Sequence, residues 1–205
     1  MPRDRFIDDI HCLTGVPRHR RMNVPPMPSA HLFVNLGGPV RLRDCGPSVP
    51  PAVCTDGWFM GVWTRCFLSE YPARVRVVGV RFKPWGLSPF TGLPAAGPRD
   101  RWVPADAVWP RSVDRIRNQA GEAASATGTL RVLEAELRSR LAGVPPRGLG
   151  LVRHACGRLE ASHGAVPVGT LADAAGVSGN HLAAQFKSHV GVIRSGWRGS
   201  TASRD

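Results

Sequence analysis

The sequence predicts an α+β protein in which a β-rich region comes first and helices follow. The 205 residues include 19 Pro and 23 Gly, so the regular elements must be short, and a simple helical bundle is excluded. Apolar residues alternate with polar ones in the first half and recur every three or four positions later. We therefore expect a β-rich domain over residues 1–110, a helical linker over 111–147, a three-helix subdomain over 148–192 and a disordered tail over 193–205.

The composition is that of a folded and strongly basic chain. Hydrophobic residues make up 42% of it, and the formal net charge is +12. Arginine carries nearly all the positive charge, since Lys83 and Lys187 are the two lysines. The charge favours a nucleic-acid partner, although GC-rich codons are a second source of the arginine excess. No signal peptide pattern and no membrane-spanning apolar run is visible, so we expect a cytoplasmic protein.

The first strands are expected to form a hairpin. Leu32, Phe33, Val34 and Leu36 form an apolar run, and Val40 and Leu42 alternate with Arg41 and Arg43. Gly37 and Gly38 lie between these two segments, and two glycines are typical of a tight hairpin turn.

Two later segments also have the pattern of strands. Residues 58–63 form one, and residues 74–82 form the clearest one. In residues 74–82, every second residue is apolar, but this alternation slips by one position at Val77–Val78, beside Gly79. Such a slip next to a glycine predicts a β-bulge or a bend. Such bends are common in small barrels and jelly rolls.

The segment from Phe82 to Pro94 is rich in proline, glycine and aromatic residues, which predicts an ordered loop or lid. Large aromatics here and upstream could line an apolar pocket with one polar anchor. The candidate pocket residues are Trp58, Trp63, Arg81, Trp85 and Phe90. The alternative, which we favour, is that most of these aromatics belong to the core.

The pattern of residues 111–147 predicts two helices. Ser112 is expected to cap the first, with Asp114 in its first turn. The second carries a leucine stripe, formed by Leu130, Leu133, Leu137 and Leu141. This stripe is expected to face either the β domain or the same helix of a second copy in a homodimer, with the β domain slightly favoured because three turns are short for a coiled coil.

The region 148–192 contains the pattern of a helix-turn-helix. Such a motif needs a small residue where the two helices cross and a residue tolerant of positive φ in the turn. Ala172 and Gly176 meet these needs, and Ser178 caps the second helix. The core of the motif is predicted to consist of Leu171, Ala172, Ala175, Gly176, Val177, Leu182 and Phe186. An ordinary corner between two helices is the alternative.

At these residues the sequence resembles the AraC/XylS-type transcriptional regulators. The resemblance covers Val168 to Gly191, through Leu171-Ala172, Gly176-Val177-Ser178, His181-Leu182, Phe186-Lys187 and Val190-Gly191. It extends more weakly to His31–Pro39 and to Gly79–Pro94. The resemblance implies a cupin-like or jelly-roll sensor domain, a helical linker and sequence-specific binding to double-stranded DNA.

The helix after Ser178 is expected to be the recognition helix. With Leu182 and Phe186 facing inward, the opposite face would carry the DNA-contacting residues Ser178, Asn180, Ala183, Ala184 and Lys187. Asn can bond an adenine edge, Ala can contact a thymine methyl group, and Lys can reach a guanine or a phosphate. Family resemblance implies that Asn180, Ala183 and Ala184 face bases. We expect His181, beside the core face, to be packed and hydrogen-bonded.

The chain lacks the patterns of common catalytic sites. Metal-binding cupins carry clustered His and Glu ligands, whereas His31 stands alone on its predicted strand. We find no phosphate-binding glycine loop, nucleophile elbow or paired carboxylates. We therefore expect no metal, no cofactor and no enzymatic activity. Two hypotheses remain: a transcriptional regulator with an unidentified small-molecule effector, or a non-enzymatic ligand-binding or interaction protein that has lost DNA binding.

The cysteines are expected to be reduced. The five are Cys12, Cys45, Cys54, Cys66 and Cys156. An odd number without any C-x-x-C spacing is not typical of a zinc site or a disulfide framework.

Residues after Val192 depart from the family pattern. They are rich in Gly and Ser and lack apolar periodicity. A shifted reading of permitted codons would encode a basic amphipathic helix of the kind the family has there. We therefore expect an out-of-frame tail, and a truncated regulator that holds one half of the DNA-binding module.

Overall fold

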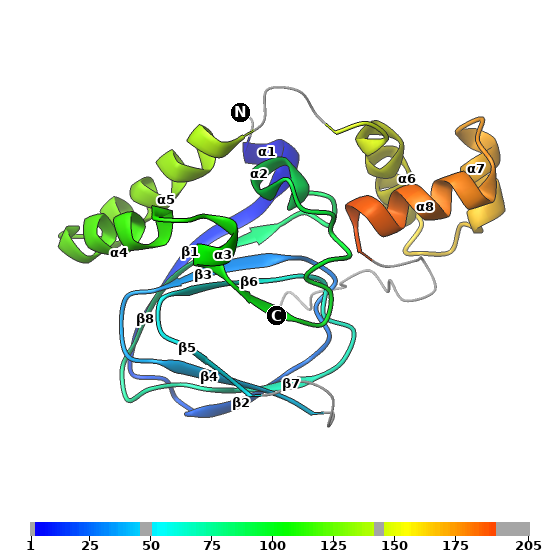
Figure 1. The fold of residues 1–205 in the computed structure, drawn as a ribbon. Helices are drawn as coiled ribbons and strands as arrows, with labels where there is room; N and C mark the ends of the chain where they lie inside the picture. Colours follow the sequence, from blue (N-terminus) through cyan, green and yellow to red (C-terminus); the bar gives the residue numbers. More distant parts are fainter. Residues whose placement is uncertain (1–2, 46–50, 142–145, 192–205) are drawn as a thin grey trace.

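The computed structural model describes residues 3–45, 51–141 and 146–191, and its strands form two antiparallel sheets that face each other (Figure 1). Within these residues, sheet A has the strand order β1-β8-β3-β6-β9, and sheet B has the order β2-β7-β4-β5. The strands are β1 (Ile7–Gly15), β2 (Arg21–Val24), β3 (His31–Asn35), β4 (Val40–Asp44), β5 (Ala52–Cys54), β6 (Gly57–Met60), β7 (Phe67–Glu70), β8 (Val75–Phe82) and β9 (Trp102–Pro104). The α+β order of the elements agrees with the prediction, and the predicted tail lies outside the described residues.

The segment around Gly37 and Gly38 is a crossover between the sheets, so the predicted hairpin is wrong. β3 belongs to sheet A, and β4 belongs to sheet B. Neither glycine has the positive φ that a two-residue hairpin turn needs. Instead, the buried Asn35 side chain donates to the carbonyls of Gly38 (2.9 Å) and Cys54 (3.2 Å) and accepts from the Gly37 amide (3.1 Å). These bonds direct the chain out of one sheet and into the other.

Strand β8 has apolar residues in both phases because both of its faces are buried. Val78 and Val80 lie in the core under the helices, and Val77 faces the space between the sheets. β3 and β8 pair in continuous register, so the predicted bulge at Val77–Val78 is wrong. The irregularity lies in β1 instead, between Ile7 and Asp9. A strand covered on both sides needs no alternation of polarity.

Helices cover the outer face of sheet A (Figure 1). They are α1 (Arg3–Phe6), α2 (Ser88–Thr91), α3 (Ala105–Val108), α4 (Ser112–Glu122) and α5 (Ala126–Arg140). Leu133 and Leu137 of α5 are fully buried in the main core, and Leu130 and Leu141 are half-buried against it. Of the two partners predicted for this stripe, the structure supports the β domain.

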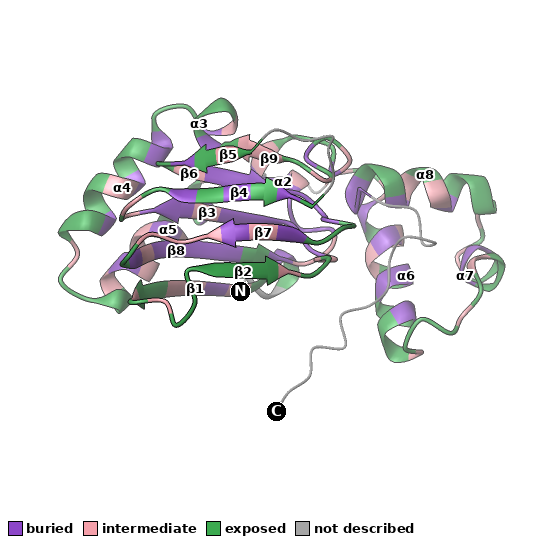
Figure 2. Ribbon diagram, turned by 90° about the horizontal axis from the view of Figure 1, so that it is seen from below, coloured by how far each residue is buried: buried purple, intermediate pink, exposed green. Residues whose placement is uncertain are grey.

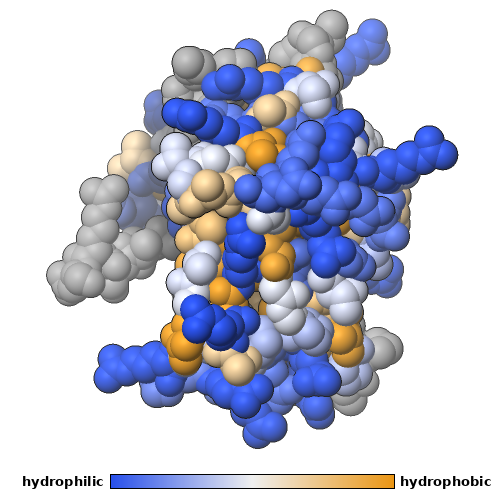
Figure 3. All heavy atoms as spheres, turned by 90° about the vertical axis from the view of Figure 1, so that its left-hand side faces the viewer, coloured by the Kyte–Doolittle hydropathy of each residue, from blue (hydrophilic) through white to orange (hydrophobic). Residues whose placement is uncertain are grey.

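The surface at the α4–α5 end agrees with inward-facing leucines. On the face seen in Figure 3, hydrophilic side chains dominate, and apolar side chains appear in small areas between them.

A buried carboxylate joins α4 to α5. Glu136 of α5 forms ion pairs with Arg115 of α4 and, at 2.5 Å, with Arg140. Burial raises the pKa of Glu136, but the hydrogen bonds from Arg140 and Arg115 outweigh this effect and hold the pKa below its usual value. The Arg140 guanidinium also lies over the Trp109 ring, 4.5 Å from its centroid.

Ser112 does not cap α4, so this prediction is wrong. The N-cap residue is Arg111, with a φ of 62°, and Ser112 is the buried first residue of the helix. Its hydroxyl accepts a hydrogen bond from Arg140 (2.6 Å), so it serves the contact between the two helices instead.

Three further helices lie beside one end of the sandwich (Figure 2). They are α6 (Leu149–Ala161), α7 (Val168–Ala174) and α8 (Gly179–His189). The Ala95 amide of the sandwich donates to the Ser188 carbonyl at 2.9 Å. Gly191, with a φ of 88°, passes so close to Ala95 that a Cβ atom there would lie 2.5 Å from the Ala95 carbonyl oxygen. This close approach fixes the end of α8 against the loop that follows α2.

Shortening Leu133 should destabilise the fold strongly. Leu133→Ala should lower the free energy of unfolding by about 2–5 kcal/mol, because the side chain is buried between α5 and sheet A. Leu93→Ala is the matched control, since Leu93 is 38% exposed and should change stability by less than about 0.5 kcal/mol. Urea denaturation at neutral pH measures both. Equal losses in the two variants would show that α5 does not pack as described.

Candidate functional site

Helices α7 and α8 are joined by a short turn and pack against each other. Leu171 and Ala172 of α7 are buried against Leu182 and Phe186 of α8. Gly176 lies in the turn with a φ of 65°, a conformation that favours glycine. The small side chain of Ala172 lets the two helices approach at their crossing. Ala175 and Val177, the other predicted core residues, are half-buried.

The N-terminus of α8 is open to solvent and capped by Ser178. The Ser178 hydroxyl accepts from the His181 amide at 3.2 Å. His181 itself is exposed, so the prediction of a packed histidine is wrong. A capped, exposed N-terminus leaves the first turn of α8 free to approach a partner.

The outward face of α8 carries the residues predicted to contact DNA. Asn180, Ala184 and Lys187 are exposed, and Ala183 is half-buried. They lie opposite the buried Leu182, as the helical period requires. The structure therefore brings these four residues to one face.

Helix α6 packs against the side of α8 that faces away from Lys187. Its buried residues Val152, Ala155 and Leu159 share the core with α8. Gly148, just before α6, has a φ of 80°, and a Cβ atom there would lie 1.8 Å from the Gln185 side-chain oxygen. The His189 ring also forms a hydrogen bond with the Arg147 carbonyl (2.9 Å). These contacts hold α8 by the side that faces away from Lys187.

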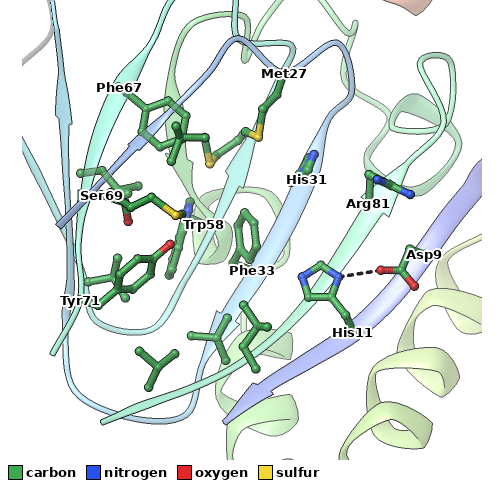
Figure 4. A pocket seen from close by; sticks show the side chains of 18 residues that line it. Asp9, His11, Met27, His31, Phe33, Trp58, Phe67, Ser69, Tyr71 and Arg81 are labelled. Atoms are coloured by element: carbon green, nitrogen blue, oxygen red, sulfur yellow. Dashed lines mark hydrogen bonds and ion pairs between the residues drawn. The ribbon is translucent and has the colours of Figure 1, made fainter. Parts of the chain in front are cut away.

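A second candidate site is a pocket of about 280 Å³ between the two sheets (Figure 4). Most of its walls are apolar, as in typical small-molecule sites. Its lining residues are Asp9, His11, Leu13, Met22, Val24, Met27, His31, Phe33, Val40, Leu42, Trp58, Met60, Phe67, Ser69, Tyr71, Val75, Val77 and Arg81. Sheet A and sheet B both contribute to it.

The charged and histidine side chains labelled in Figure 4, Asp9, His11, His31 and Arg81, come from sheet A, whereas the hydroxyl groups of Ser69 and Tyr71 lie on the sheet B side. His11 pairs with Asp9 at 3.1 Å. The His31 ring bonds the Ser29 hydroxyl through Nε2 (3.1 Å), and its buried Nδ1 has no partner among the described residues. Burial, followed by the charges of His11 and Arg81, lowers the pKa of His31 from 6.5 to about 3. His31 is therefore neutral at physiological pH.

The structure brings only two of the five predicted pocket residues into this cavity. Trp58 and Arg81 line it. Trp63 instead stacks on Trp102, with ring centroids 4.6 Å apart. Trp85 and Phe90 lie on the other face of sheet A, in the core under the helices. For these three, the alternative of core packing is correct.

Sequence reasoning missed most of the cavity wall. His31 and Phe33 alternate on β3, and Phe33 stacks on Trp58 of the neighbouring strand, with centroids 5.2 Å apart. Gly79 leaves space for the His11 and Phe33 rings, because a Cβ atom there would lie 2.7 Å from His11 Nε2 and 3.0 Å from Phe33 Cδ1. A usable signal was the alternation on β3, which places His31 and Phe33 on one face.

The described residues hold no group of three or more His, Cys, Asp or Glu side chains placed to bind a metal ion. Within the same ranges, every helix is too short or too polar to cross a lipid bilayer.

The burial of His31 should make stability depend on pH. An unfolded His31 takes up a proton below pH 6.5, whereas the folded one resists protonation down to about pH 3. Stability should therefore fall as the pH drops below 6.5, by up to about 1.4 kcal/mol per pH unit from this group. His31→Phe should remove that part of the slope. Urea denaturation at several pH values tests this, and identical slopes in both proteins would contradict it.

One family model matches the N-terminal half of the chain. A family model described as "Domain of unknown function (DUF6597)" matches residues 4–104. That match ends at the last residue of β9, so it coincides with the sandwich. No curated protein sequence matches the chain.

Similar solved structures include one AraC-like transcriptional activator. The AraC-like transcriptional activator CuxR has a TM-score of 0.40 and 12% identity over 92% of this chain and 74% of its own. Apo ToxT K231A from Vibrio cholerae has a TM-score of 0.34 and 14% identity over 91% and 94%. Ethanolamine utilization protein Q from Salmonella typhimurium has a TM-score of 0.28 and 15% identity. That match covers 36% of this chain and 55% of the other protein. Likeness at this level does not transfer a function.

Proposed function

We propose that the protein is a transcriptional regulator of the AraC type that binds double-stranded DNA through α8. The observation that carries this proposal is the α7–α8 unit. Its turn at Gly176 and its cap at Ser178 present a single exposed helix face with Asn180 and Lys187 on it. A capped helix presented in this way is the part of a helix-turn-helix that enters the major groove.

The side chains on that face suit limited base reading. Asn180 can form two hydrogen bonds with an adenine edge, and Ala183 and Ala184 can contact thymine methyl groups. Lys187, in the last turn, can reach a phosphate or a guanine. Two alanines read few bases, so much of the affinity should come from the charge of the chain, +12 overall.

The sandwich would then be the sensor domain, in a cupin-like or jelly-roll arrangement. Its pocket would hold a small-molecule effector, with His31 as a neutral hydrogen-bonding group in a mostly apolar wall. The leucine-bearing helix α5 would act as the linker between sensor and DNA-binding unit.

Removing the charge of Lys187 should weaken DNA binding in a salt-dependent way. Duplexes selected by the 205-residue chain from a randomised pool serve as the probe, and fluorescence anisotropy measures the affinity at several salt concentrations. Lys187→Ala should reduce the slope of log affinity against log salt by about 1 if the ammonium contacts a phosphate. Lys83→Ala is the control, because the other lysine lies on the sandwich over Trp85.

Asn180→Ala separates base reading from charge. It should relax preference at one base pair by about 1–3 kcal/mol and leave the salt slope unchanged. Unchanged affinity and preference in both Asn180→Ala and Lys187→Ala would show that α8 is not the recognition helix.

A second candidate function is ligand binding without DNA binding, and the pocket favours it. A mainly apolar cavity that contains a buried histidine nitrogen without a partner is a typical ligand site. Binding of a small molecule by a chain with no affinity for any DNA would support this function over the first.

Filling the pocket should abolish ligand binding. Val24 lines the cavity from the outer strand β2 and is half-buried, so Val24→Trp can place an indole in the space. Small, mainly apolar compounds that raise the melting temperature of the natural chain should no longer do so in this variant. Val53→Trp is the control, since Val53 is 59% exposed on β5. Compounds that stabilise both variants equally would place the binding site elsewhere.

A further inference from the structure

Two cysteines lie opposite each other at the ends of neighbouring strands of sheet B. Strands β4 and β7 pair from Arg41↔Glu70 to Asp44↔Phe67. Cys45 directly follows β4, and Cys66 directly precedes β7. Continuing the register by one residue sets Cys45 opposite Cys66, although the two are far apart in the sequence.

Both thiols are on the outer side of the sheet. Asp44 and Phe67 are buried toward the interior, whereas their neighbours Cys45 and Cys66 are exposed, as strand alternation requires. The Arg65 guanidinium binds the Asp44 carboxylate at 2.8 Å, which holds the two strand ends together. A hydrogen bond with the Cys66 side chain is the main cause of a raised pKa of Cys45, so the two side chains are in contact.

The backbone spacing suits a disulfide bond. Residues directly opposite in an antiparallel pair have Cα atoms about 4.5–5.5 Å apart. Disulfides span Cα separations of about 4.4–6.8 Å. Cysteines opposite each other in such a register therefore lie within the separation that a disulfide spans.

The other three cysteines differ from this pair. Cys54 and Cys156 are buried, and burial raises the pKa of each to about 12. Cys12 lies on β1, with its sulfur 3.6 Å from the Thr14 hydroxyl. Among the described cysteines, Cys45 and Cys66 are the two that are exposed and also lie opposite another cysteine.

We propose that Cys45 and Cys66 form an oxidisable dithiol site that closes into a cross-strand disulfide. With glutathione disulfide as the oxidant, one thiolate attacks a sulfur of the oxidant and releases one glutathione thiolate. The second cysteine thiolate then attacks the mixed disulfide and releases the other glutathione. The two cysteines lose two electrons and two protons, and glutathione disulfide takes them up as two thiols. This site is independent of the DNA-binding proposal.

The disulfide would link strands that form the pocket wall. Leu42 of β4 and Phe67 of β7 line the cavity, and Phe67 is adjacent to Cys66. The bond would also close the chain between β4 and β7 into a loop, which lowers the entropy of the unfolded state. Oxidation should therefore stabilise sheet B around the pocket.

Oxidation of the full chain tests the site. The reduced protein is incubated with glutathione disulfide, the remaining thiols are alkylated, and peptides are mapped by mass spectrometry without reduction. A peptide pair that joins Cys45 to Cys66 is expected, with a rise in melting temperature of about 5 °C or more. Cys45→Ser and Cys66→Ser should each lose both results. Cys12→Ser should keep both.

Other outcomes of the same experiment would overturn the proposal. A stable mixed disulfide with glutathione on Cys45 or Cys66 would overturn the proposal, because the second thiol would not be in reach. Linkage of either cysteine to another cysteine, or a dimer joined between two chains, would overturn it as well. Recovery of both Cys45 and Cys66 as free thiols after incubation with glutathione disulfide would overturn it too. Misfolding would not explain that result, because the melting temperatures of both serine variants show independently that the chain is folded.

Discussion

The central strands of sheet A are buried on both faces, and most of the molecule depends on this constraint. One face packs under α3, α4 and α5, and the other faces sheet B across the pocket. A sheet covered twice must carry apolar side chains in both phases of its central strands, as β8 does with Val77 and Val78. The same double cover removes His31 from water, which lowers the pKa of its ring and keeps it neutral.

Buried polar groups are used at the junctions of the fold. Asn35 satisfies three backbone groups where the chain leaves sheet A for sheet B. Glu136 is held by Arg115 and Arg140 where α5 meets α4. A buried polar group without partners costs stability, so each of these positions accepts few alternative arrangements. The junctions are consequently specified as strictly as the apolar core.

The DNA-binding candidate is attached to this frame through the far end of α8. The contact between Ala95 and Ser188, together with the close approach of Gly191, fixes the C-terminal end of the helix. The first turn, with Ser178 and Asn180, stays exposed. The α7–α8 unit thus lies apart from the pocket, whereas the pocket and the Cys45–Cys66 pair share strands β4 and β7 of sheet B.

Elements whose stabilising contacts are local could be predicted from the sequence. Helix α8 follows from the cap at Ser178, the glycine turn at Gly176 and the apolar period, because helical contacts join residues three and four positions apart. Strand β8 was also recognisable from its composition. The tertiary structure alone decided what depends on pairing between distant segments. Whether Gly37 closes a hairpin, which aromatics line the pocket and which cysteine faces Cys45 are all set by strand order and register. These are properties of contacts between residues far apart in the chain, and no local pattern encodes them.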